Sequence, residues 1–332
     1  MMDKIMRFLT KEHALIGLSI TRIFFGIALL YELLINIPIR YLLWGPKGLV
    51  PFAEYRADMM ERHVWTIFDL SPTEWMVDLV IFGGILICLL YIIGFQTRIM
   101  GVLMFVIMFS LYMRNLDITH GGDNILRILL LYIMFTSVGR YFSVDQWLKK
   151  RREKKAKPPS WLSRSQLLTD SKAVIHNFAW LACVIQLVFM YFSSGSYKIM
   201  GSLWQNGTGL YYASRVQDFF NPDLTPLLWK SDLIMILMSY GTVLFQVAFP
   251  FLLLNRFTKY VAILSACMLH IGIAAFMGLV DFSWIMIGCE MMLLTNTDFY
   301  RLRDYSRQIR KRFRASSEQK EVQIATTIEQ AK

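Results

Sequence analysis

The sequence predicts an all-α integral membrane protein, a bundle of about eight transmembrane helices with aromatic-rich loops on its outward side. Three observations predict this class. The 332 residues are 55% hydrophobic and only 18% charged, whereas about 25% of the residues in a soluble domain are charged. The apolar residues gather in long runs, and lysines and arginines cluster beside these runs. The composition excludes a disordered chain and argues against an ordinary soluble enzyme.

Eight apolar runs approach the roughly 20 residues that a helix needs to cross a bilayer. The runs at 98–113 and 283–296 are short, and the first run lacks the cleavage site of a removable signal peptide, so we expect it to remain as an anchor. The cysteines all lie inside apolar runs without a CxxC pair, so neither a disulfide framework nor a metal site is predicted. The runs lie at about 14–36, 76–96, 98–113, 125–142, 175–197, 233–254, 260–280 and 283–296.

Two basic tracts predict how the helices are oriented. One lies in a loop at 146–173 and the other in a tail at 301–332, and four apolar runs separate them. Both tracts therefore lie on one side, and the positive-inside rule places that side and both termini in the cytoplasm. We expect one multispan membrane domain over 1–300, interrupted by the basic loop, and a basic then polar tail that is disordered.

The net charge of +11 could also indicate a polyanionic partner. Orienting signals and contacts with anionic membrane lipid account for clusters of Lys and Arg beside membrane spans. Membrane lipid is therefore an expected partner, and nucleic acid is not.

The same topology sends four segments outward, at 37–75, 114–124, 198–232 and 279–283. The first and third are rich in Trp, Tyr and Phe. Such residues favour the headgroup region, so we expect these two segments to lie on the outer leaflet or to cap the bundle.

Ionisable residues inside apolar runs are costly in lipid and mark candidate sites. Arg22 and Glu32 are too far apart for one i,i+4 pair, so we expect different partners for them. Asp123 and Arg127 lie one helical turn apart, which suits either an ion pair at a helix start or a functional site. Glu290 lies in the last run.

Lys198 and His270 are the residues to which chemistry is most readily assigned. Lys198 ends the fifth run among aromatic residues, where lost hydration would favour a neutral amine that can act as a base; the alternative is a lysine that reaches the headgroups. His270 lies halfway along its run. It is either a buried neutral histidine bonded to a neighbouring helix or part of a proton relay.

Three segments together resemble the HTTM domain, a bacterial multispan domain related to the vitamin K-dependent gamma-carboxylase. They are RNLDITHGGDNILRILLLYIMF at 114–135, FSSGSYKIMGSLWQNGTGLYY at 192–212 and LHIGIAAFMGLVDFS at 269–283. Within that family the sequence is most similar to the SdpB-like proteins of Bacillus-type bacteria.

The resemblance implies a role in maturing an exported antimicrobial peptide toxin at the outer face of the bacterial cytoplasmic membrane. The implied partners are the peptide precursor and a small membrane-associated, SdpA-like protein. Lys198 matches the carboxylase lysine that deprotonates a reduced quinone, with His270 and Asp123 in catalytic support. The carboxylase histidine falls near Gly122, so His120 is out of register, which places quinone-coupled carboxylation in doubt. The residues expected to bind substrate are His120, Arg127, Trp204, Asn206, Tyr211 and Tyr212.

Three functions therefore stay open. The first is maturation of a peptide toxin, and the second is a membrane carboxylase or oxidoreductase that uses a reduced quinone. The third is a non-enzymatic exporter or scaffold for the peptide. No cofactor is identified from the residues themselves, and a reduced quinone enters only through the resemblance.

Overall fold

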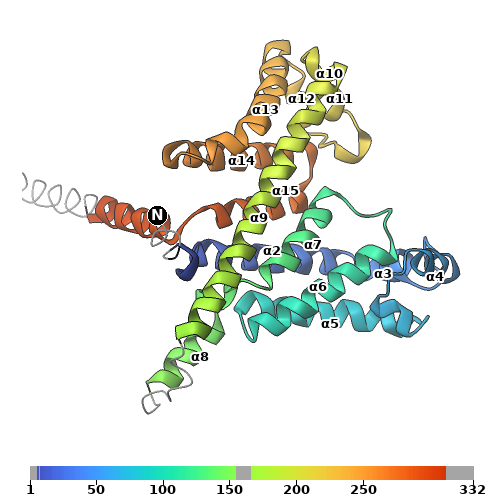
Figure 1. Ribbon diagram of the computed structural model, residues 1–332. Coiled ribbons are helices and arrows are strands. Elements are labelled where there is room, and N and C mark those ends of the chain that lie inside the picture. Colours follow the sequence, from blue (N-terminus) through green and yellow to red (C-terminus); the bar gives the residue numbers. More distant parts are fainter. Residues whose placement is uncertain (1–5, 7, 155–165, 312–332) are drawn as a thin grey trace, which may run out of the picture.

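The computed structural model describes residues 6, 8–154 and 166–311, and these residues form helices and turns without a strand (Figure 1). The predicted all-α membrane fold is confirmed. Six of the described helices are long and apolar enough to cross a membrane, and each coincides with one of the predicted runs. They are α2 (Leu15–Ile35), α5 (Glu74–Ile93), α6 (Thr97–Arg114), α9 (Gln166–Met200), α13 (Asp232–Leu252) and α14 (Arg256–Met277).

The other two predicted spans are short helices. α7 (Gly121–Ile133) has 13 residues and α15 (Val280–Glu290) has 11. At 1.5 Å per residue they are about 20 and 17 Å long, less than the roughly 30 Å of a hydrocarbon core. The run at 125–142 is interrupted after Ile133, where the hydroxyl and the backbone N–H of Thr136 both donate to the Ile133 carbonyl, and the short helix η3 (Val138–Arg140) follows. The run at 283–296 divides between α15 and η6 (Met291–Leu293).

α2 lies at the centre of the bundle and packs against α5, α15 and η6, while α9 crosses the bundle and packs against α7 and α13 (Figure 1). α2 packs closely against the continuous segment formed by α15 and η6. A Cβ atom at Gly17 would lie 2.1 Å from the Met291 carbonyl oxygen. One turn further on, Thr21 donates a hydrogen bond of 2.8 Å to the Gly288 carbonyl. Small residues thus let these two backbones approach.

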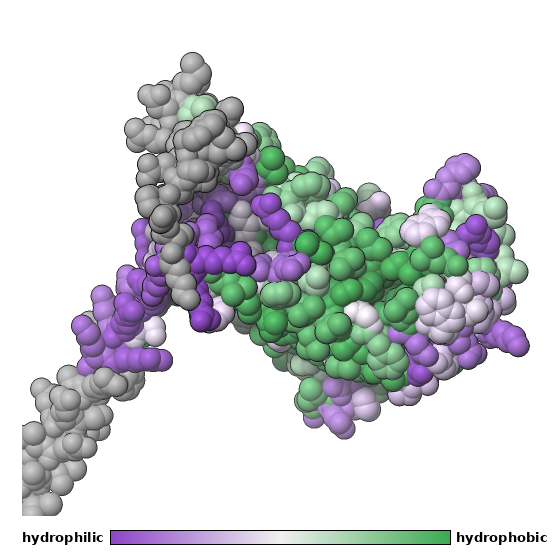
Figure 2. All heavy atoms as spheres, turned by 90° about the horizontal axis from the view of Figure 1, so that it is seen from below, coloured by the Kyte–Doolittle hydropathy of each residue, from purple (hydrophilic) through white to green (hydrophobic). Residues whose placement is uncertain are grey.

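The surface has an apolar band between two polar ends, as Figure 2 shows. The segments predicted to face outward lie at one end, which we call the aromatic end. Asn115 donates to the Leu43 carbonyl and His120 contacts Asp281, which joins the segments 37–75, 114–124 and 279–283. The segment 198–232 joins the end of α14, where Asn221 donates to the Ala275 carbonyl. The short elements here are η1 (Ile37–Ile39), α3 (Arg40–Trp44), α4 (Phe52–Glu61), η2 (Ile67–Leu70), α10 (Ser202–Gln205), α11 (Gly209–Ala213), η5 (Gln217–Phe219) and α12 (Thr225–Leu228).

The opposite end, which we call the basic end, gathers residues 8–14, the start of α6, α8 (Val144–Glu153) and the start of α14. Much of the predicted basic loop at 146–173 is helical, since α8 occupies its first part and α9 begins at Gln166. The predicted disordered tail also needs correction, because residues 301–311 continue a helix that starts at 296. The remainder of the loop, 155–165, and of the tail, 312–332, lies outside the described residues.

Asp298 ties this last helix to α14. Its carboxylate accepts hydrogen bonds from Lys259, Tyr260 and the Thr295 backbone. Burial alone would raise the pKa of Asp298, but these bonds outweigh burial and lower the pKa from 3.8 to about 2. The folded state is therefore stabilised by this carboxylate above about pH 4, and the stabilisation is lost as the pH falls toward 2.

Asp298→Asn is expected to lower the stability at pH 7 by about 2 kcal/mol, at 1.36 kcal/mol per pKa unit. Thermal unfolding in detergent should show a gap between wild type and variant that closes as the pH approaches 2. Asp304→Asn removes an exposed carboxylate of the same helix and serves as the control. A pH-independent gap would contradict the assignment.

Candidate functional site

Four ionisable side chains meet at the aromatic end, where α2, α7 and α15 converge. His120 caps the N-terminus of α7, and its Nε2 lies 2.5 Å from Asp281 and 3.6 Å from Asp123. Glu32 of α2 and Asp123 line one small cavity, and the charge of Glu32 acts on His120. We call His120, Asp123, Asp281 and Glu32 the His120 cluster.

Hydrogen bonds orient the His120 ring. Its Nδ1 accepts a 2.9 Å bond from the Gly122 backbone N–H, so the ring hydrogen is on Nε2 and is donated to Asp281. The His120 N–H donates in turn to Asp123 and completes a capping box. Burial alone would lower the pKa of His120, but the bond to Asp281 and the nearby carboxylates raise it. The side chains of His120 and Asp281 are 29% and 33% exposed, so this pair is accessible.

A second polar group lies inside the bundle and consists of Tyr191, His270 and Glu290. The Tyr191 hydroxyl donates a 2.6 Å bond to Glu290 and lies 2.9 Å from Nε2 of His270. The hydroxyl has one hydrogen, so Nε2 of His270 must donate to the hydroxyl oxygen. Nδ1 of His270 and the other Glu290 oxygen are buried and have no hydrogen-bond partner among the described residues. We call these three residues the Tyr191 triad.

Phe282 separates the two groups. Its ring centroid lies 6.4 Å from that of His120 and 5.5 Å from that of His270, both in edge-on geometry. Of the three residues expected to be catalytic, the structure therefore places Asp123 in the His120 cluster and His270 in the Tyr191 triad.

Lys198 joins neither group. Its Nζ donates a 2.7 Å bond to Ser194 and lies 5.2 Å from the centroid of the Trp204 ring. Lys198 follows Tyr191 by two turns of α9, a rise of about 10 Å along the helix. The contact with Trp204 is a cation–π interaction, which favours the charged amine.

The residues expected to bind substrate divide among three places. His120 lies in the cluster already described. Arg127 donates to Asn124 and covers the Tyr112 ring, so it forms no ion pair with Asp123. The others lie on and between α10 and α11. Trp204 of α10 contacts Lys198, and Asn206, directly after α10, is exposed. Tyr211 of α11 packs edge-on against Tyr212, and its hydroxyl accepts a bond from Arg215.

Sequence reasoning missed Asp281 and Tyr191 and gave no site role to Glu32. Asp281 lies in the predicted outward turn at 279–283, and Glu32 lies in the first apolar run. A carboxylate in either place is a signal that the sequence shows. Tyr191 had no comparable signal, because a tyrosine in an apolar run is ordinary.

Among the described residues, no group of three or more His, Cys, Asp or Glu side chains could hold a metal ion. The cavity beside Glu32 and Asp123 has a volume of about 20 Å³. This is room for about one water molecule. The cluster can thus hold and move a proton, but it has no enclosed chamber for a large substrate.

Comparisons with known proteins agree with a membrane protein. The family model described as "TQO small subunit DoxD" matches residues 57–169, which include α5, α6, α7 and α8. The Bacillus subtilis (strain 168) protein described as "Uncharacterized protein YitO" is 26% identical over 243 residues, or 70% of this chain and 72% of that protein. No solved structure matches.

The fold and the matches together define a multispan membrane protein that is similar, over residues 57–169, to the DoxD family. The matched part contains His120 and Asp123 but neither Lys198 nor the α15 partner Asp281. The matches do not show the HTTM or SdpB-like resemblance, and the functions that it implies are therefore proposals.

Tyr191→Phe is expected to lower the stability of the bundle by about 1–3 kcal/mol, because Glu290 and His270 lose their buried partner. Thermal unfolding in detergent measures this change. The control is Tyr197→Phe on the same helix, since Tyr197 is 73% exposed. Equal melting temperatures for the two variants would show that the triad is not a stabilising network.

Proposed function

We propose that the protein matures an exported antimicrobial peptide toxin at the outer face of the bacterial cytoplasmic membrane. The observation that carries the proposal is the accessible His120 cluster at the aromatic end, on the side opposite the basic residues. By the positive-inside rule the basic end, with both termini, is cytoplasmic, so the cluster faces outward. A peptide precursor that emerges from the cell would meet it there.

The chemistry that this geometry supports is proton transfer. His120 has one proton on Nε2 and a carboxylate on either side, an arrangement that suits a general acid or base. Lys198, about two helical turns beyond Tyr191 on α9, remains a second candidate base. Trp204, Asn206, Tyr211 and Tyr212 remain candidate contacts of the peptide. The small membrane-associated partner would bind at the same end or supply the remaining catalytic groups.

His120→Ala is expected to reduce the mature peptide in the medium by a factor of about 100 or more, the usual contribution of a general acid or base. The experiment expresses the protein with the peptide precursor and partner and measures mature peptide by mass spectrometry at equal membrane levels. Lys198→Ala and Lys198→Arg test the second base. Lys230→Ala removes an exposed lysine of the same end and is the matched control.

Two outcomes would contradict this assignment. Unchanged yield with both His120→Ala and Lys198→Ala would refute the catalytic form of the proposal. Precursor that leaves the cell without covalent change, in the same amount with every variant, would indicate a non-enzymatic exporter or scaffold.

A second candidate is a membrane carboxylase or oxidoreductase that uses a quinone. It is favoured by an apolar cavity of about 190 Å³ between α2 and α15, lined by Ile27, Ala28, Tyr31, Val280, Asp281 and Trp284. Trp284 is fixed there by a 3.0 Å bond to the Phe24 carbonyl. Apolar walls with one carboxylate, itself bonded to His120, fit the ring of a lipid-soluble quinone.

Ile27→Trp is expected to fill this cavity and to weaken binding of menaquinone about tenfold or more, since a site closed by an indole loses its ligand contacts. Quenching of tryptophan fluorescence by added menaquinone, corrected for the new indole, measures affinity. Leu34→Trp places the same indole on a lipid-exposed position of α2 outside the cavity and is the control. The absence of saturable binding to the wild type would remove this candidate.

A further inference from the structure

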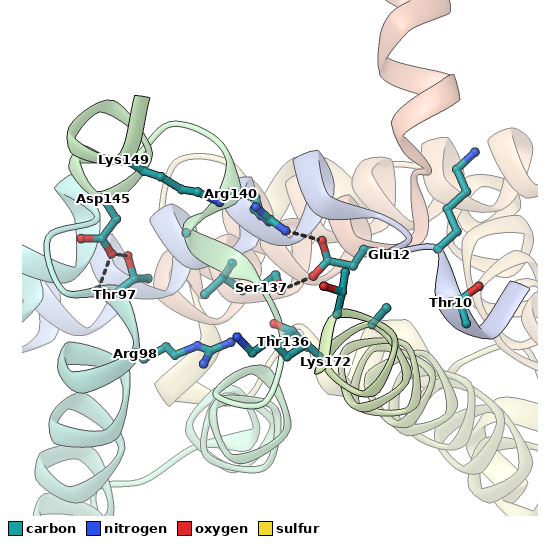
Figure 3. Close-up of a pocket in the computed structure, with 15 residues that line it drawn as sticks. Thr10, Glu12, Thr97, Arg98, Thr136, Ser137, Arg140, Asp145, Lys149 and Lys172 are labelled. Carbon is teal, nitrogen blue, oxygen red and sulfur yellow. Dashed lines mark hydrogen bonds and ion pairs between the residues drawn. The ribbon is translucent and has the colours of Figure 1, made fainter. Parts of the chain in front are cut away.

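A separate cavity of about 740 Å³ opens at the basic end, far from the His120 cluster (Figure 3). Its walls come from the segment before α2, the start of α6, the stretch from Thr136 through α8, and the start of α9. Five basic residues line it, together with the hydroxyls of several threonines and Ser137. The basic residues are Lys11, Arg98, Arg140, Lys149 and Lys172.

The two carboxylates in the wall are already occupied. Glu12 accepts a 2.6 Å bond from Ser137 and a 3.0 Å bond from Arg140. Asp145 accepts bonds of 2.8 and 2.6 Å from the backbone N–H and the hydroxyl of Thr97. Figure 3 draws these contacts as dashed lines on opposite sides of the cavity.

Arg98 and Lys172 lie between these two carboxylates and pair with neither. Both side chains are exposed, and within residues 8–154 and 166–311 no carboxylate lies within ion-pair distance of them. Lys11 is also exposed, and Lys149 contacts Glu153 only loosely, at 3.8 Å. The basic side chains therefore give the cavity an excess of positive charge that the carboxylates of the described residues do not neutralise.

The position of the cavity indicates which anion would fill it. Thr97 begins α6, Thr169 begins the apolar stretch of α9, and Glu12 precedes α2 by three residues. The cavity thus lies level with the ends of three candidate spans, where the phosphates of a bilayer are found. Basic pockets between helices at this level recognise phosphate head groups.

We propose that this cavity is a binding site for a phosphate-bearing anion, held by Arg98 and Lys172 with Lys11 and Lys149 around it. The phosphodiester of an anionic phospholipid is one source and a soluble phosphate compound is the other. Binding at this site is distinct from a general electrostatic attraction of the basic end to anionic lipid, because Arg98 of α6 and Lys172 of α9 would contact the same anion. It is independent of the outward function proposed above.

The test compares the purified, delipidated wild-type protein with a double variant, Arg98→Gln with Lys172→Gln, which we call the cavity variant. Native mass spectrometry counts bound phosphatidylglycerol against phosphatidylcholine, and calorimetry titrates pyrophosphate as the soluble probe. The double variant should bind the anion about thirtyfold more weakly, given the energy of two basic residues near phosphate. Arg307→Gln, Arg310→Gln removes the same charge from exposed positions outside the cavity and should bind as the wild type does.

The outcomes distinguish a lipid from a soluble phosphate compound and also show whether the proposed site exists. If the wild type prefers phosphatidylglycerol to phosphatidylcholine and the cavity variant loses that preference, the site binds lipid. If the wild type shows no lipid preference but binds pyrophosphate, and the cavity variant loses that binding, the site takes a soluble ligand. Arg98→Lys with wild-type Lys172 should keep most of the affinity, because the charge is retained. An equal loss in the cavity variant and the control variant, or no saturable binding of either probe by the wild type, would overturn the proposal.

Discussion

The buried guanidinium of Arg22 sets the position of α2, on which the rest of the bundle is assembled. Arg22 is fully buried. It donates to the carbonyls of Tyr91 and Ile92 at the end of α5 and, over 2.7 Å, to the Phe142 carbonyl. The end of a helix carries the negative pole of its dipole, which suits a cation. Because an unpaired buried charge costs several kcal/mol, this arrangement disfavours any other register of α2 against α5.

The Arg22 anchor constrains both the turn after α5 and the far end of α2. Gly94 takes a left-handed conformation (φ 74°), and a Cβ there would strike both Arg22 and Ser143, so only glycine lets the chain turn around the guanidinium. Glu32 lies ten residues beyond Arg22, a rise of about 15 Å. With α2 fixed at Arg22 and bonded to α15 through Thr21, the positions of Glu32 and Asp281 beside α7 follow.

The sequence predicts the parts of this structure that depend on local composition. Apolar runs predict α2, α5, α6, α9, α13 and α14, because length and hydropathy decide whether a helix can span a bilayer. They overestimate the length of α7, because the chain turns at Thr136 through local hydrogen bonds to the Ile133 carbonyl that hydropathy does not reveal. The motif around His120 and Asp123 is visible in the chain, but the partner Asp281 is 161 residues away from His120, and only the packing of α15 against α7 brings them together. Lys198 was expected beside the catalytic groups, whereas the length of α9 keeps it two turns beyond Tyr191.

Exposure decides which of the two polar groups can act on a substrate. In the Tyr191 triad His270 is 3% exposed and Glu290 is fully buried, and neither residue lines the two cavities beside the His120 cluster. Glu32 and Asp123 of the His120 cluster line the smaller of these cavities and Asp281 lines the larger, and about a third of the His120–Asp281 pair is exposed. Phe282 packs against both groups, and its ring cannot pass a proton. Asp281 of the cluster and Glu290 of the triad both lie on α15, so the triad stabilises the helix that places Asp281 beside His120.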